Sequence, residues 1–412
     1  MIEVLGAAAR SAARRQGQAS TAQKNAALIR AAELIREAAG DLEAKNQPDL
    51  DDARQQGISG ALLDRLRLTP ARIEGMASGL RQVAALPDPI GEVTAGFVRP
   101  NGLRMTRFRA PLGVVAVIYE ARPNVTADAA GLCLKAGNAV ILRGSSYALR
   151  SNVAIGQLLA SAQEEVGLDP KAVQVMEDSS REGARQLMQA REWIDLLVPR
   201  GGPKLLAAIE AEATVPYVLD GAGNCHVYVD ESADLDMAAE IVVNSKVSRP
   251  GVCNSAEKLL VHAAVAGQFL PRVGPELEMQ GVELRVDDRA AEILGSAKPA
   301  TEGDWPQEYL DLIMAVRVVD SLDEAIEHVR TFSSGHTEAI VTRDLANADR
   351  FVKETDAAVV MINAATRFTD GEEFGYGAEI GISTQKLHVR GPMGLEALTS
   401  ERWVVQGSGQ TR

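Results

Sequence analysis

Apolar positions recur at helical spacing through the first part of the chain. Between residues 20 and 40 the apolar face includes Leu28 and Ile35, and Ser20 and Gln23 stand at the spacing of a capping box. Further helical patterns continue to Ala84. We therefore expect an all-helical N-terminal region.

From Gly91 the pattern changes to alternating, often β-branched residues. Two such runs flank Asn101 and Gly102, and an Asn-Gly pair is favoured in two-residue type I′ hairpins. A two-stranded ribbon is only marginally stable by itself. We expect this ribbon to pack on another chain or on the C-terminal tail, which contains the sequence RWVVQGSG.

Short apolar runs alternate with helical stretches through the rest of the chain. This alternation is typical of βαβ units around parallel sheets that are buried on both faces. One set of runs precedes Cys253 and a second set follows it, which predicts two α/β domains with a boundary near residue 240. The first set is GVVAVIYE, NAVILRGS, AVQVME, IDLLVPRG, YVLDGAG and HVYVDE, and the second is EKLLVH, IMAVRVVD, EAIVT and AAVVMIN.

Composition and charge exclude several classes of protein. Of the 412 residues, 24% are charged and 46% are hydrophobic, which describes a soluble globular protein and not a membrane protein. The net charge is −13 and no basic stripe is present, so we expect no nucleic-acid partner. The first residues lack the apolar core of a secretory signal, and we expect a cytoplasmic protein.

The cysteines and histidines show no metal-ligand spacing, so we expect no metal and no disulfide framework. Cys133 lies in an apolar helical pattern and is expected to be a packing residue. Cys225 and Cys253 both lie near Gly-containing turns, and position alone does not decide between them. Lys246 and Arg249 precede Cys253. Nearby cations favour a reactive thiolate, although these two also suit a solvated surface.

Two Gly-rich turns follow predicted strands. The first contains Gly201 and Gly202 and would place free backbone N–H groups at a helix start, where a pyrophosphate can bind. The second contains Gly221. Neither turn has the spacing of GxGxxG or of a P-loop, so a plain tight turn is the alternative.

The segment ILRGSS ends another strand at the edge where open α/β sheets bind ligands. Its residues Arg143, Gly144 and Ser145 offer a cation and a hydroxyl. These groups could hold an adenosine 2′-phosphate and so select NADP over NAD. A solvated strand end is the alternative.

Four longer segments resemble one family. They are similar to segments of the γ-glutamyl phosphate reductases, also called glutamate-5-semialdehyde dehydrogenases, a branch of the aldehyde dehydrogenase superfamily. The resemblance begins near Ser20 and extends through essentially the whole chain, with Phe332 standing where the family usually has Tyr or His. The segments are PGVCNSAEKLLVH, AIEHVRTFSSGHTEAIVTRDLANADRFV, NAATRFTDGEEFGYGAEIGIST and QKLHVRGPMGLEALTS.

The resemblance implies an oxidoreductase that uses NADPH to reduce L-glutamate 5-phosphate to L-glutamate 5-semialdehyde and phosphate, the second step of proline biosynthesis from glutamate. Cys253 matches the family's nucleophile. Its thiolate would displace phosphate from the acyl phosphate, and hydride would then reduce the thioester.

The resemblance also assigns roles around Cys253. Asn124 is the candidate donor to the oxyanion, and Glu308 matches the Glu that binds the nicotinamide ribose. Hydrolytic relatives carry a deacylating Glu where this chain has Leu219, with Asp220 alongside. A reductase needs no such base, because water would waste its thioester.

Four cations are candidates for binding the charged groups of the substrate, because a guanidinium suits either a phosphate or a carboxylate. Structural ion pairs are the alternative for each of them. They are Arg122, Arg249, Arg367 and Lys386.

The implied architecture is aldehyde dehydrogenase-like, with two open α/β domains and a β oligomerisation arm. The Rossmann-like NADP-binding domain would comprise residues 1–91, 111–240 and 371–391, and the catalytic domain residues 241–370. Residues 92–110 and 392–412 would form the arm of a homo-oligomer, either a dimer or a tetramer.

Two other functions are considered. A CoA-acylating aldehyde dehydrogenase of the same superfamily would also use Cys253 and also lack a hydrolytic base. A catalytically dead nucleotide-binding scaffold would have no need of Cys253 in its Pro-Gly kink. A transient contact with glutamate 5-kinase, which would supply a labile acyl phosphate, is left open by the sequence.

Overall fold

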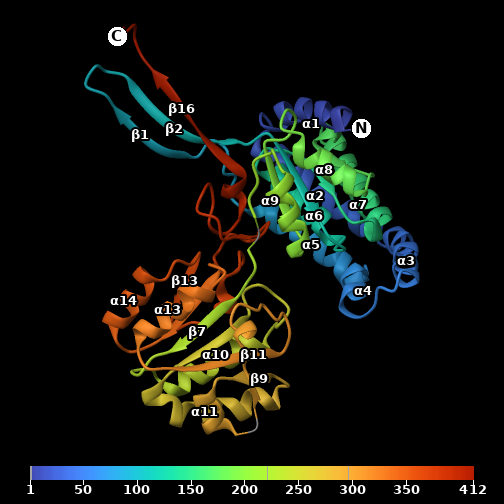
Figure 1. Ribbon diagram of the computed structural model, residues 1–412. Helices are drawn as coiled ribbons and strands as arrows, with labels where there is room; N and C mark the ends of the chain where they lie inside the picture. Colours follow the sequence, from blue (N-terminus) through green and yellow to red (C-terminus); the bar gives the residue numbers. More distant parts are fainter. Residues whose placement is uncertain (1, 220, 296) are drawn as a thin grey trace. The chain divides into compact units, whose positions relative to one another are not determined.

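The computed structural model describes residues 2–219, 221–295 and 297–412, and the chain divides into two compact units (Figure 1). Unit 1 comprises Met1–Leu219, Gly375–Gly381 and Met393–Arg412. Unit 2 comprises Asp220–Phe374 and Ile382–Pro392. No helix in the described ranges is long and apolar enough to cross a membrane.

Helices fill the N-terminal part of unit 1, as the sequence predicts. The Ser20 side chain accepts from the backbone of Gln23 in the capping box that begins the second helix, α2. Leu28 and Ile35 of α2 are fully buried, which confirms the predicted apolar face. The helices are α1 (Ile2–Gln16), α2 (Thr21–Glu37), α3 (Ala39–Gln55), α4 (Gly60–Leu66) and α5 (Pro70–Ala85).

The core of unit 1 is a four-stranded parallel sheet in the order β5-β4-β3-β6. Every residue of the central strand β3 is buried, because helices lie on both faces of such a sheet. The strands are β3 (Val114–Tyr119), β4 (Ala139–Arg143), β5 (Val173–Val175) and β6 (Leu196–Arg200). The helices between and after them are α6 (Asn124–Lys135), α7 (Leu149–Glu165), α8 (Arg181–Gln189) and α9 (Pro203–Glu212).

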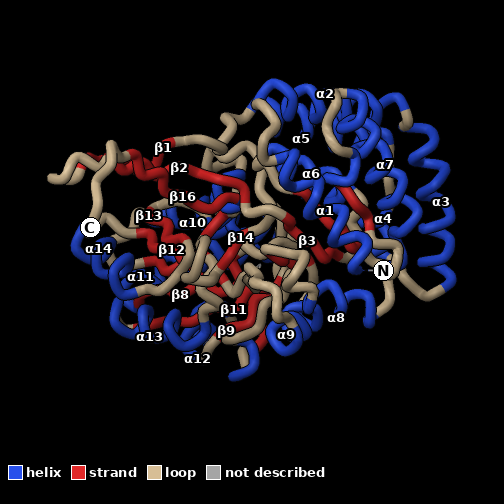
Figure 2. The backbone as a smooth tube through the Cα atoms, turned by 90° about the horizontal axis from the view of Figure 1, so that it is seen from above, coloured by secondary structure: helices blue, strands red, loops and turns tan. Residues whose placement is uncertain are grey.

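A separate antiparallel sheet forms the arm of unit 1. Its order is β1-β2-β16, from β1 (Val93–Val98), β2 (Arg104–Pro111) and β16 (Thr399–Gln406) (Figure 2). The C-terminal tail therefore pairs with the predicted hairpin along its length. This pairing confirms one of the two partners that the ribbon was expected to have.

The hairpin turn differs from the expected type I′. Gly102 has a φ of 87°, but Asn101 is not among the described non-glycine residues with positive φ. The amide of Gly102 donates to the carbonyl of Arg99 and the amide of Arg99 to the carbonyl of Leu103. Pro100 fixes a negative φ at the position where a type I turn needs one, so a three-residue loop with a left-handed Gly102 replaces the two-residue turn.

Unit 2 is built on a seven-stranded parallel sheet in the order β10-β9-β11-β8-β7-β12-β13. The strands are β7 (Cys225–Val229), β8 (Ala256–His262), β9 (Glu283–Val286), β10 (Lys298–Pro299), β11 (Ile313–Val319), β12 (Thr337–Val341) and β13 (Val359–Ile362). The helices are α10 (Leu235–Val247), α11 (Ala263–Met279), α12 (Asp288–Leu294), α13 (Leu322–Phe332) and α14 (Leu345–Glu354). Two parallel sheets in separate units confirm the predicted fold class.

The division between the units falls earlier in the chain than residue 240. Unit 2 begins directly after Leu219, because β7 pairs with β8 and β12 and not with the sheet of unit 1. The described residues of the run YVLDGAG, which was expected to be a strand, form only a single bridge, between Tyr217 and Leu197. Asp220, within that run, lies outside the described residues.

Candidate functional site

Cys253 lies in the short turn between α10 and β8 of unit 2. The Pro-Gly pair before it ends the helical pattern, and β8 begins three residues after it, at Ala256. Its side chain is half-buried, whereas β8 is almost entirely buried. The sequence therefore places this cysteine at an accessible edge of a rigid sheet.

The other two cysteines are both fully buried. Burial raises the pKa of the Cys133 thiol and that of the Cys225 thiol well above the ordinary value. A buried thiol that stays protonated is a poor nucleophile. Cys253 is therefore the one cysteine of the chain whose exposure suits nucleophilic chemistry.

Two of the candidate cations lie close to Cys253. Arg367 donates from Nε to Oγ of Ser248 at 3.2 Å and from Nη1 to the side-chain oxygen of Asn254. The pKa of Arg367 lies below its ordinary value because the group is partly buried and because the positive charge of Arg249 is near, while the acidic groups of Asp370 and Cys253 oppose that shift. The structure thus brings Arg249, Arg367 and Cys253 together.

Lys386 lies elsewhere on the surface of unit 2. It forms an ion pair with Asp356 at 2.5 Å, and Arg390 pairs with the same carboxylate at 2.9 Å. Lys386 and Asp356 are both more than half exposed, and such pairs contribute little to stability. The structural alternative considered for Lys386 is therefore present in this fold.

Glu308 lies beside the turn that packs on Cys253. Its Oε1 accepts from the amide of Gly223 at 2.6 Å. A Cβ at Gly223 would lie 1.5 Å from the carbonyl oxygen of Cys253, so only glycine allows the two backbones to approach this closely. The adjacent Asn224 anchors the turn. Its side-chain amide nitrogen donates to the backbone carbonyls of Trp305 and Phe332 at 2.8 and 2.7 Å. Glu308 and the nucleophile are thus linked through Gly223.

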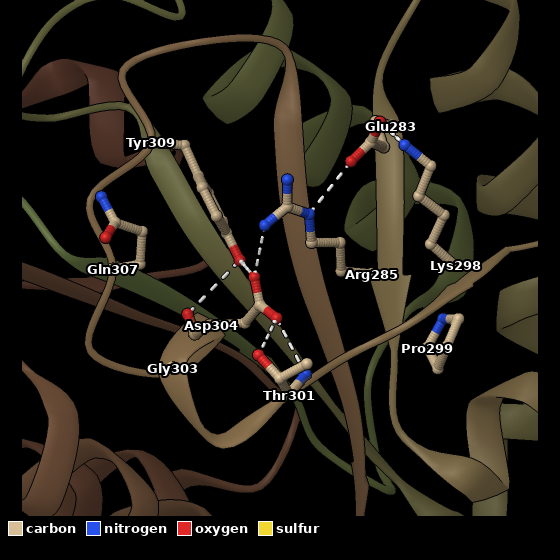
Figure 3. Close-up of a pocket in the computed structure, with 9 residues that line it drawn as sticks. All are labelled: Glu283, Arg285, Lys298, Pro299, Thr301, Gly303, Asp304, Gln307 and Tyr309. Carbon is tan, nitrogen blue, oxygen red and sulfur yellow. Dashed lines mark hydrogen bonds and ion pairs between the residues drawn. The ribbon is translucent and has the colours of Figure 1, made fainter.

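The loop that carries Glu308 also borders a cavity of about 580 Å³ (Figure 3). Asp304 accepts from Arg285 at 2.6 Å and from the hydroxyl of Tyr309 at 2.8 Å. These contacts hold one flank of the Glu308 loop. No residue of this cavity was expected from the sequence, because its charged side chains, on β9, β10 and the loop that follows, form no motif of recognised spacing.

In unit 1, Arg122 and Ser145 line a second cavity of about 290 Å³, together with Glu120 and Tyr147. The hydroxyl oxygen of Ser145 is buried and has no hydrogen-bond partner within the described residues. Buried hydroxyls are normally hydrogen-bonded. The cavity therefore offers a donor suited to a bound polar ligand.

Arg143, the last residue of β4, contacts the segment before α8. Its guanidinium donates to the backbone carbonyls of Ser179 and Ser180 at 2.5 and 3.0 Å, and burial lowers its pKa. A Cβ at Gly144 would lie 2.0 Å from the side-chain amide of Asn152, so any larger residue there would displace Asn152.

Asn124 stands at the first residue of α6. Its side-chain amide donates to Asp128 at 2.9 Å, one turn along the same helix. Burial raises the pKa of Asp128 to about 6. The amide proposed for the oxyanion thus has an internal partner in this structure.

The two Gly-rich turns make different contacts. The amide of Gly202, at the start of α9, donates to Oε1 of Glu120 at 3.0 Å, so the N–H expected to meet a pyrophosphate is held by a carboxylate. The amide of Gly221 donates to the carbonyl of Ile382 at 3.1 Å. A Cβ at Gly201 or Gly221 would be crowded by Leu205 or Thr384, respectively. Within the described ranges no three His, Cys, Asp or Glu side chains are grouped as a metal site would require.

Comparison with known proteins gives a consistent result. The sequence model of the aldehyde dehydrogenase family matches residues 2–293 and 306–404. Gamma-glutamyl phosphate reductase of Heliobacterium modesticaldum is 54% identical over 411 residues, covering 100% of this chain and 99% of the relative. The relative from Moorella thermoacetica with the same name is 52% identical over 411 residues, covering 100% and 98%.

Solved structures agree with the sequence relatives. The gamma-glutamyl phosphate reductase of Thermotoga maritima superimposes with a TM-score of 0.98 at 45% identity, covering 100% of this chain and 99% of that one. An acetylating aldehyde dehydrogenase from Geobacillus thermoglucosidasius has a TM-score of 0.73 at 19% identity, covering 100% and 97%, and shows a shared fold. The chain therefore belongs to the aldehyde dehydrogenase family, in its branch of gamma-glutamyl phosphate reductases.

Proposed function

We propose that this protein reduces L-glutamate 5-phosphate to L-glutamate 5-semialdehyde and phosphate, with NADPH as reductant, in the second step of proline biosynthesis. The observation that carries the proposal is the half-buried Cys253 with Arg249 and Arg367 beside it, in a chain 54% identical to a gamma-glutamyl phosphate reductase. Two guanidinium groups suit a substrate with a phosphate and a carboxylate.

The Cys253 thiolate attacks the acyl carbon, a C–S bond forms, and the C–O bond to phosphate breaks. Arg249 and Arg367 favour the thiolate and hold the departing dianion. A nicotinamide bound beside Glu308 would supply hydride to the thioester carbon, which would give the oxyanion of a thiohemiacetal. Collapse of the thiohemiacetal releases the aldehyde and regenerates the thiolate.

The oxyanion that forms at each tetrahedral stage needs hydrogen-bond donors. One donor aimed at it typically contributes about 3–4 kcal/mol. We assign this role to the backbone amide of Cys253 and to the side-chain amide of Asn124. The Asn124 amide must break its hydrogen bond with Asp128 to donate to the oxyanion. We assign Arg122 and Lys386 to the binding of the charged groups of the substrate. For this role Lys386 must break its ion pair with Asp356.

The Leu at the position of the hydrolytic Glu favours reduction over hydrolysis of the thioester. Leu219 stands where hydrolytic relatives have a Glu, and it cannot activate water. The thioester therefore persists until hydride arrives, as a reductase requires.

For the cofactor we assign Glu308 to the nicotinamide ribose and Ser145 with Arg143 to the adenosine 2′-phosphate. The hydroxyl of Ser145, which has no hydrogen-bond partner in the described part of the chain, fits a phosphate oxygen. Gly144, Gly201, Gly202 and Gly221 shape the backbone beside these groups, and Glu120 must release the amide of Gly202 if a pyrophosphate binds there.

We further propose a cytoplasmic homo-oligomer, either a dimer or a tetramer, assembled through the β1-β2-β16 arm. The arm exposes Phe97, Val98, Trp403 and Val405, which an oligomer interface would cover. A transient contact with glutamate 5-kinase belongs to the same proposal, because an acyl phosphate is labile in water.

The test is an assay in the reverse direction with glutamate 5-semialdehyde, phosphate and either NADP⁺ or NAD⁺. We expect reduction of NADP⁺ that depends on phosphate, and less reduction of NAD⁺. Reduction without phosphate but with release of acyl-CoA when CoA is added would overturn the proposal in favour of a CoA-acylating enzyme. No turnover of any semialdehyde by folded protein would favour a nucleotide-binding scaffold.

A further inference from the structure

We infer that Glu257 and Lys258, neighbours on β8, are positioning residues that hold the loop of Glu308 in place for the cofactor. The inference rests on the proposed role of Glu308 at the nicotinamide ribose. Glu257 and Lys258 are both fully buried, although one is acidic and the other basic. The contacts of each side chain show what the two charges do.

Lys258 holds the loop on one side of Glu308. Its Nζ donates to the carbonyl of Gln307 at 2.7 Å, and it lies 4.5 Å from the centre of the Tyr309 ring. An ammonium over an aromatic face is attracted by the electron density of the ring. Lys258 therefore contacts the residues directly before and directly after Glu308.

Glu257 holds the next residue of the same loop. Its Oε1 accepts from the amide of Leu310 at 3.3 Å, and its Oε2 forms a buried ion pair with Lys246 at 3.1 Å. Leu310 has a φ of 55°, which non-glycine residues rarely adopt. Such a conformation persists where surrounding contacts fix it. The hydrogen bond to Glu257 is one of those contacts.

A third charge holds the outer side of the loop. Arg285 lies 5.0 Å from the centre of the Tyr309 ring and donates to Asp304, which also accepts from the Tyr309 hydroxyl (Figure 3). The Tyr309 ring thus interacts with two cations, Arg285 and Lys258. These contacts restrict the loop on both flanks of Glu308.

The position of this loop bears on the nucleophile as well as on the cofactor. Glu308 accepts from the amide of Gly223, and Gly223 packs on the carbonyl oxygen of Cys253. A displacement of the Glu308 carboxylate therefore changes both its reach to a ribose and the support of the nucleophile turn.

Stability alone does not account for charges at these two positions. Burying ions costs desolvation free energy, and apolar side chains of similar size often serve the fold equally well. The next two residues of β8, Leu259 and Leu260, are apolar and fully buried. What Glu257 and Lys258 add is directed hydrogen bonds to the loop of Glu308.

The test compares Lys258→Met, Lys258→Arg and the wild type by NADPH fluorescence titration and by steady-state kinetics. We expect Lys258→Met to fold and to weaken NADPH binding about 10- to 100-fold, because a misplaced carboxylate no longer meets its partner. The KM for glutamate 5-semialdehyde should change less than about twofold, a split that general destabilisation would not produce. Lys258→Arg should restore part of the NADPH affinity.

Lys298→Met is the matched control. Lys298 borders the same cavity, but it pairs with Glu283 and is 66% exposed. Its substitution should leave NADPH affinity unchanged. Wild-type NADPH affinity in folded Lys258→Met would overturn the inference.

Two further measurements keep the inference separate from folding and from the proposed function. If Lys258→Met does not fold, Tyr309→Leu tests the same loop, because Tyr309 is only half-buried. This variant should weaken NADPH binding in the same way. Unchanged NADPH affinity would contradict the inference. NADPH titration requires no turnover. If NADPH affinity falls in Lys258→Met but the wild-type protein reduces no acyl phosphate, the proposed reaction is refuted and the inference stands.

Discussion

The carbonyl oxygen of Cys253 accepts a hydrogen bond from Sγ of Cys225 at 3.2 Å. Burial raises the pKa of the Cys225 thiol, so Cys225 remains a protonated donor and holds the nucleophile turn. Gly223 packs against the same carbonyl oxygen and leaves no room for a side chain. The turn of the nucleophile is therefore fixed from β7 and from the segment before it.

Gly223→Ala should displace the Cys253 turn. The new Cβ would lie 1.5 Å from the Cys253 carbonyl oxygen, and a backbone clash of this size forces a shift. We expect a loss of about 1–3 kcal/mol in the free energy of unfolding and about a 100-fold loss of kcat/KM. Gly267→Ala in α11 is the control, because a Cβ there meets nothing within 4 Å and alanine favours a helix. Equal activity of the two variants would show that the turn tolerates movement.

Cys253→Ala should abolish turnover without unfolding the protein. Loss of the nucleophile removes the thioester route, and we expect kcat to fall by at least about 10³-fold with a circular dichroism spectrum like that of the wild type. Cys133→Ala serves as the comparison. It should lower stability by about 1 kcal/mol through a small cavity and keep its activity. Turnover at the wild-type rate by Cys253→Ala would refute the mechanism.

Ser145→Ala and Arg143→Ala should lower the preference for NADP over NAD. The Ser145 hydroxyl is buried without a partner among the described residues, and a 2′-phosphate would supply one. A charge-assisted hydrogen bond contributes about 1.5–3 kcal/mol, so we expect roughly a tenfold or larger loss of kcat/KM with NADP and little change with NAD. An unchanged ratio of the two kcat/KM values in both variants would exclude these residues from cofactor selection.

The sequence predicted those parts of the fold that local pattern determines. It located the N-terminal helices, the hairpin and most parallel strands, because spacing and β-branching are local signals. It missed the turn type at Asn101, because Pro100 favours a three-residue loop over the two-residue turn. It also placed the boundary near residue 240, because the pairing of β7 with β8 and β12 has no local signature.

The candidate site was predicted in the same uneven way. Cys253 and Glu308 were proposed from their place in segments that resemble the family, and their roles stay predictions. Glu257 and Lys258 were read as part of an ordinary apolar strand, EKLLVH. In a sheet covered on both faces, the side chains of neighbouring residues are both buried. The alternation of polar and apolar residues therefore does not indicate that two adjacent charged side chains are buried. The positioning role that we infer for them rests on their contacts with Gln307 and Leu310.

Asp128 should make the free energy of unfolding depend on pH. Burial raises its pKa from the ordinary value of 3.8 to about 6, so the folded state binds this proton more tightly than the unfolded state does. Its contribution is fully present below pH 3.8 and is lost as pH rises through about 6. Relative to Asp128→Asn, the wild type should lose at most about 3 kcal/mol across that window, measured by urea denaturation. A pH-independent difference between the two proteins would contradict this assignment.

Trp403→Glu should break the proposed oligomer at the arm. The Trp403 ring is 45% exposed and packs edge-on against Phe97 with ring centres 5.8 Å apart, which leaves an apolar surface on a sheet that a second chain would cover. A glutamate removes the aromatic ring and places a polar, charged group at the interface, so sedimentation velocity should show a smaller species than the wild type with unchanged helix content. Met279→Glu is the control, since Met279 is 80% exposed at the end of α11 in unit 2. If Trp403→Glu sediments like the wild type and like this control, the arm is not the surface through which the chains associate.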